Sequence, residues 1–93
     1  MKIFQSRSFE RKVKKFGKQE KKAIDKQILK IAGNPSVGAE KKGDLRGVYV
    51  NKFRIKNIQY LLSYRFVGAD LELIMIGPHE NYYRDLKNYL KAR

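Results

Sequence analysis

The chain has 93 residues and a net charge of +13, with 22 lysines and arginines against nine acidic residues. This length predicts one domain over residues 1–93 with a modest core. The lack of cysteine excludes disulfides and thiolate metal sites, and a single histidine argues against a histidine metal site, so we expect no metal and no cofactor. The first residues show no signal peptide, and no apolar run reaches the roughly 18 residues that span a bilayer, so we expect a cytoplasmic protein without a membrane partner.

The positive charge indicates the class of partner rather than the fold. A strongly basic small domain is typical of proteins that bind nucleic acid. The alternatives are lysine-rich faces that are merely solvated, and a surface that docks an acidic protein. We favour RNA, because the chain also carries one histidine, whose imidazole transfers protons near neutral pH.

The first half of the chain predicts a short strand and a helical hairpin. The strand covers residues 2–5, and Ser6 or Ser8 can then cap a helix with its side-chain oxygen. The apolar residues of that helix recur at helical spacing: Phe9, Val13 and Phe16. Gly17 is expected to end it, and a second amphipathic helix over residues 18–32 completes the hairpin.

The second half predicts a sheet. Residues 34–47 form a glycine-containing loop, because Pro35 disfavours helix in the residue before it. Alternating apolar and polar residues predict strands over 48–56 and 58–66, and a more apolar strand follows over 71–76. Residues 81–91 return to helical spacing. The expected fold is therefore α+β: an N-terminal strand, a helical hairpin, an antiparallel three-strand meander and a C-terminal helix.

The only histidine, His79, directly follows the last predicted strand at a Gly-Pro break. RNA cleavage by 2′-OH attack needs a group that moves protons and cations that stabilise the phosphorane. His79 is the candidate acid or base, and a structural loop histidine is the alternative. Phosphate contacts are expected from Arg65, at the end of its strand, and from a row of three cations that share one strand face: Lys52, Arg54 and Lys56. An ordinary solvated face is the alternative for that row.

Residues after His79 add further candidates. Tyr82 and Tyr83 point about 100° apart on a helix, so we expect Tyr82 to be core and Tyr83 to stack on a base or orient the 2′-OH. Glu80 can orient His79 or contact RNA, and it is equally suited to the first turn of a helix. The helical hairpin also carries lysines that can dock RNA, among them Lys12, Lys15 and Lys22.

Several segments in order carry a family resemblance. They are Phe9 in its basic helix, Gly43-Asp44-Leu45-Arg46-Gly47, the strand over residues 59–64, and the segment from Ile76 to Tyr83. With this order and spacing the chain resembles the RelE/ParE superfamily of toxins from type II toxin–antitoxin modules, over nearly its whole length. The resemblance implies a compact sheet with the helical hairpin on one face, and an antitoxin that wraps and neutralises the toxin.

The resemblance leaves two activities open. RelE-like members cut messenger RNA in the ribosomal A site, whereas ParE-like members poison DNA gyrase. In RelE-like nucleases a histidine near the position of His79 serves as acid or base, and an arginine at the strand position of Arg65 contacts the scissile phosphate. We therefore expect a ribosome-dependent endoribonuclease (an mRNA interferase), with a gyrase inhibitor as the alternative. A helix after His79 could cover or reshape this site, and the sequence leaves open whether it does.

Overall fold

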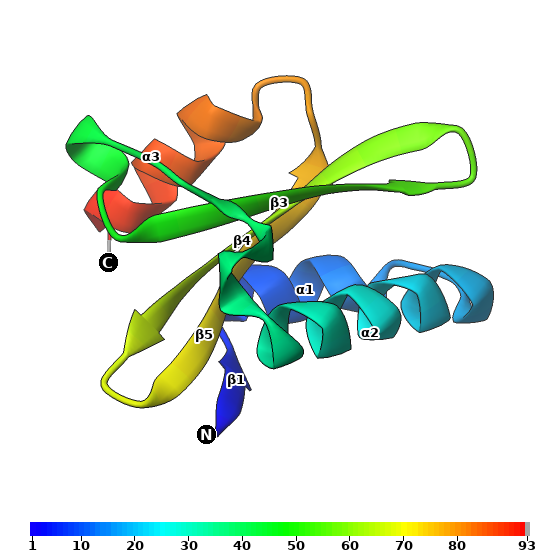
Figure 1. Cartoon of the computed structure of the whole chain (residues 1–93). Coiled ribbons are helices and arrows are strands. Elements are labelled where there is room, and N and C mark those ends of the chain that lie inside the picture. The colour runs from blue at the N-terminus through cyan, green and yellow to red at the C-terminus, as the bar shows by residue number, and fades with distance from the viewer. Residues whose placement is uncertain (93) are drawn as a thin grey trace.

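The computed structural model describes residues 1–92, which form three layers (Figure 1). A five-stranded sheet with the order β1-β5-β4-β3-β2 separates α1 and α2 on one face from α3 on the other. The elements are β1 (Ile3–Gln5), α1 (Arg7–Lys14), α2 (Lys18–Gly33), β2 (Ala39–Glu40), β3 (Val48–Ile55), β4 (Ile58–Val67), β5 (Asp70–Pro78) and α3 (Tyr82–Ala92). This confirms the α+β prediction, and the pairing of β1 parallel to β5 makes the sheet mixed.

The helical hairpin begins at Ser6 rather than at Ser8. The Ser6 hydroxyl accepts a bond from the Phe9 amide at 3.1 Å and donates to the Ile74 carbonyl, so it ties α1 to β5. Gly17 was expected to end α1, but the helix already stops at Lys14. Gly17 has an extended backbone with φ −74° and caps the start of α2, where its amide donates to the Glu20 carboxylate at 2.8 Å. A glycine between two helices thus starts the second one here.

The segment predicted as a loop over residues 34–47 holds the short edge strand β2 and two single 3-10 turns, η1 (Pro35–Val37) and η2 (Gly43–Leu45). The buried Tyr64 hydroxyl fixes this segment to the sheet, because it accepts a bond from the Gly38 amide at 3.0 Å and donates to the Pro35 carbonyl. A strand of two residues leaves no periodic pattern, so the sequence alone could not reveal it.

Two apolar cores lie on opposite faces of the sheet. Phe9, Ile24 and Ile31 of the helical hairpin pack on one face. Tyr82 and Leu86 of α3 pack on the other face, and the strand residues there include Val48, Val50, Leu61 and Ile74. β5 is buried on both faces from Leu71 to Gly77, which confirms the expectation that it is a covered central strand. Among residues 1–92, no helix is long and apolar enough to cross a membrane.

Candidate functional site

The candidate site lies on the face of the sheet that α3 partly covers. β3 alternates there between buried Phe53 and Ile55, which face the helical hairpin, and exposed Lys52 and Arg54, which face the other side. This confirms that Lys52 and Arg54 share a face. The Arg54 guanidinium donates to the Asn57 carbonyl at 3.4 Å, a long bond that leaves its other N–H groups available for a phosphate.

Lys56 does not continue this row. β3 ends at Ile55, and Lys56 lies in the turn to β4 with φ +57°. The alternation of cations had predicted a strand over residues 48–56, one residue longer than β3. Lys56 is exposed at the tip of the β3–β4 hairpin, beyond Arg54.

The strand register brings His79 to the same end of the sheet as these cations. Arg54 is opposite Gln59 on β4, the next residue Tyr60 is opposite Pro78 on β5, and His79 follows Pro78. Neighbouring strands lie about 4.8 Å apart, so β3 and β5 flank β4 with roughly 10 Å between their backbones. Long side chains from both strands can therefore contact one phosphodiester.

His79 is exposed in a tight turn that leads into α3. The Tyr82 amide donates to the His79 carbonyl at 3.2 Å, and Asn81 adopts φ +60°, a left-handed conformation that asparagine tolerates better than most residues. The His79 ring meets Tyr83 edge to face, with ring centroids 6.4 Å apart. The structure therefore places the candidate acid or base beside the tyrosine that was expected to face the substrate.

Tyr83 also contacts a lysine that the sequence analysis missed. The Lys41 ammonium lies over the Tyr83 ring, 5.1 Å from its centroid, which is within the range of a cation–π interaction. Lys41 follows the two-residue strand β2, and its amide donates to the Val48 carbonyl at 2.9 Å. No periodicity connects residue 41 with residue 83, so no signal in the sequence could have shown this contact.

Tyr82 anchors the start of α3, as expected for the packing member of the tyrosine pair. It is 3% exposed, and its hydroxyl lies 2.7 Å from the Met75 carbonyl and 2.8 Å from Ser63 Oγ. Burial is the main cause that raises the pKa of Tyr82, so the phenol stays neutral at physiological pH. Because Tyr82 directly precedes Tyr83, these contacts also hold the backbone from which the Tyr83 ring extends beside His79.

Arg65 does not join this group, so the expectation that it lies near His79 is wrong. Arg65 pairs across the sheet with Glu72, whereas Tyr60, next to the site, pairs with Pro78. Five residues at about 3.3 Å each place Arg65 roughly 16 Å along β4 from that end. Its guanidinium is bound to the buried Glu72 carboxylate at 2.8 Å. The residue of β4 level with Lys52 is the fully buried Leu61.

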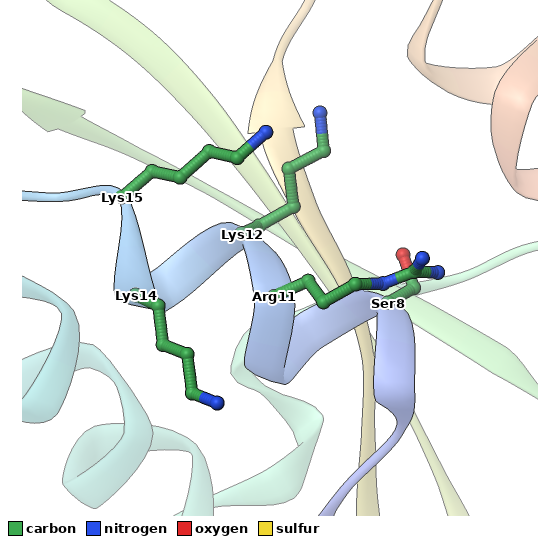
Figure 2. A pocket seen from close by; sticks show the side chains of 5 residues that line it. All are labelled: Ser8, Arg11, Lys12, Lys14 and Lys15. Carbon is green, nitrogen blue, oxygen red and sulfur yellow. The ribbon is translucent and has the colours of Figure 1, made fainter.

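The other candidate cations, on the helical hairpin, lie at different distances from the His79 turn. Lys12 of α1 and Lys15, which directly follows that helix, extend towards the end of β5, while Lys14 points away from them (Figure 2). Lys12 also lines a hollow with Glu80 and Pro78, close to the His79 turn. Lys22 is exposed on α2, on the opposite side of the sheet from Lys52. Among residues 1–92, no three histidine or acidic side chains gather where they could hold a metal ion.

Comparisons with known proteins give a family and a fold. The sequence model of the ParE-like toxins of type II bacterial toxin–antitoxin systems matches residues 3–87. The YoeB/ParE toxin from Agrobacterium tumefaciens superposes with a TM-score of 0.70 at 23% identity, over 85% of this chain and 99% of that chain.

Two structures from E. coli are also similar in fold. The intact RelBE toxin–antitoxin complex gives a TM-score of 0.67 at 17% identity, over 85% of this chain and 96% of that one. The isolated RelE toxin gives 0.65 at 17% identity, over 95% and 97%. At these identities the structures show the fold alone. No curated protein sequence matches the chain.

Proposed function

This chain belongs to the ParE-like toxins of type II bacterial toxin–antitoxin systems, and on that premise we propose that it arrests growth as a ribosome-dependent endonuclease of messenger RNA. A cognate antitoxin is the second partner we propose, since one solved structure of the same fold is a toxin–antitoxin complex. The ribosome would present the message in the A site, and the basic residues of α1 would face ribosomal RNA.

The proposed reaction is an attack by the ribose 2′-OH on the adjacent phosphorus. The 2′-O–P bond forms and the bond to the 5′-oxygen breaks, which leaves a 2′,3′-cyclic phosphate and a 5′-hydroxyl. His79 accepts the 2′-OH proton or delivers a proton to the leaving 5′-oxygen, because an imidazole can act as a general base or a general acid, and Lys52 or water makes the other proton transfer. Lys52 and Arg54 stabilise the phosphorane charge, and Tyr83 orients the nucleotide.

One observation carries this proposal. His79 and Tyr83 contact each other at an exposed end of the sheet, where Lys52 and Arg54 face the same side and no acidic residue in the described part of the chain forms an ion pair with either. An acid or base next to unpaired cations suits a reacting phosphodiester. Arg65 is left out of the mechanism because it lies roughly 16 Å along β4 from the His79 end of the sheet, with its Nε bound to Glu72.

Induction in growing cells tests the proposal. We expect rapid loss of protein synthesis and messages that are cut with 5′-hydroxyl ends, while plasmid supercoiling stays normal. His79→Gln should remove the cuts and the growth arrest in a protein that still folds. Lys30→Gln is the control, because Lys30 is an exposed side chain on α2, away from α1 and from the His79 turn, and it should leave the cuts in place.

A gyrase inhibitor is the second candidate. It is favoured by the match to a family named after ParE, since ParE-like members of the superfamily act on gyrase. Induction would then give DNA breaks and altered supercoiling with intact messages, and His79→Gln would remain toxic. That combination would overturn the nuclease proposal.

A further inference from the structure

A second group of cations lies beside the candidate site, in the loop between β2 and β3. Lys41, Lys42 and Arg46 surround a surface hollow of about 380 Å³, whose other lining residues are Glu40 and Gly43. None of the ion pairs among residues 1–92 involves these three cations. Asp44 is the acidic residue in this loop and Glu40 directly precedes it, so residues 40–47 together still carry a positive net charge.

The loop is held in one conformation by the fold. Leu45 is 5% exposed and belongs to the core under α3, so it anchors the middle of the loop. The Arg46 amide donates to the Gly43 carbonyl at 3.1 Å, and Gly43 has φ +67°, a conformation that glycine adopts without strain. Lys41 and Arg46 form a β-bridge that closes the loop. The three cations thus start from fixed backbone positions, which lowers the entropy cost of binding an anion.

Lys41 connects this loop to the candidate site. Its ammonium is 5.1 Å from the centre of the Tyr83 ring, and that ring is 6.4 Å from the His79 ring. The Tyr83 ring therefore lies between Lys41 of the loop and His79 of the candidate site. Arg54 lies near the end of β3, at the turn to β4, and Arg46 lies just before the start of the same strand.

We propose that the loop Lys41–Gly47 is a phosphate-binding site for the RNA strand. It would hold a phosphodiester neighbouring the one at His79, and Tyr83 would lie against the nucleotide between them. The proposal rests on the proposed nuclease function for the identity of the ligand. A single-stranded polyanion fits the observations, because its charges repeat along a line and its bases stack on exposed aromatic rings.

RNA binding measured without cleavage tests this site. In a His79→Gln background, the affinity for a short fluorescent oligouridylate would be followed over a range of salt concentrations. Lys42→Gln with Arg46→Gln should weaken binding several-fold and lower the slope of log K against log salt by about 1.4, since each phosphate contact on a single strand contributes about 0.7. Lys26→Gln with Lys30→Gln removes the same charge from exposed positions of α2 and should leave the slope unchanged.

Three outcomes would overturn the site. They are equal losses in the loop pair and the α2 pair, an unchanged slope in the loop pair, or no RNA binding by the parent chain. Loss of affinity for a polyglutamate peptide with unchanged RNA affinity would assign the loop to an acidic protein instead. Thermal unfolding of each variant separates these results from misfolding. The nuclease proposal is judged separately by cleavage with His79 present, so loss of one does not decide the other.

Discussion

Removing the Tyr82 hydroxyl tests whether α3 is fixed at its start by the contacts under it. Tyr82→Phe keeps the ring but removes the group that bonds to the Met75 carbonyl and Ser63 Oγ. Ser63 Oγ still donates to the Met75 carbonyl at 3.3 Å, so that carbonyl is not left wholly unpaired. Each buried hydrogen bond contributes about 0.5–1.5 kcal/mol, so we expect the loss of two to lower the free energy of unfolding by about 1–3 kcal/mol.

Urea unfolding followed by circular dichroism measures this change directly. Tyr83→Phe is the matched control, because it removes the same atom from the next residue, whose hydroxyl makes no hydrogen bond to the described residues. The control should change the free energy of unfolding by less than about 0.5 kcal/mol. A loss below that value for Tyr82→Phe, or equal losses for the two variants, would refute the view that the buried phenol anchors α3.

Three further predictions concern the same elements. Burial raises the pKa of Tyr82 above its ordinary 10.0, so on raising the pH the folded state keeps this proton longer than the unfolded state. The contribution of Tyr82 to the free energy of unfolding should therefore be complete below about pH 10 and fall above it. Urea titrations at alkaline pH should show a shallower fall for Tyr82→Phe. Tyr64→Phe leaves the Gly38 amide and the Pro35 carbonyl without their partner, and should lower the free energy of unfolding by about 2–4 kcal/mol in the same assay. Lys56→Gly relieves a left-handed backbone that costs about 1 kcal/mol in a non-glycine residue, and should raise the melting temperature slightly; a lower value would contradict this strain.

Local patterns in the sequence predicted the elements and part of the site. Period-two alternation put Lys52 and Arg54 on one face of β3, and the apolar run before Gly77 identified a covered strand. The position of His79 after that strand also followed from the chain order. These features depend on neighbouring residues only, which is why the sequence contained them.

Features that depend on strand register or on long-range contacts were not predictable. The register of the β3–β4 hairpin, which begins where Ile55 pairs with Ile58, places Leu61 level with Lys52 and Arg65 level with Val48. The Lys41–Tyr83 contact joins two segments that only the fold brings together. The prediction that Gly17 ends α1 was wrong, because glycine suits both the end of one helix and the start of the next, and here it starts α2.

The nuclease proposal is tested most directly with purified components. Ribosomes programmed with a defined messenger RNA would be incubated with the chain, and the ends of the RNA products would be mapped. We expect cuts that depend on the ribosome, carry 2′,3′-cyclic phosphate and 5′-hydroxyl ends, and disappear with His79→Gln. Intact messenger RNA, together with inhibition of supercoiling by purified gyrase, would contradict the account.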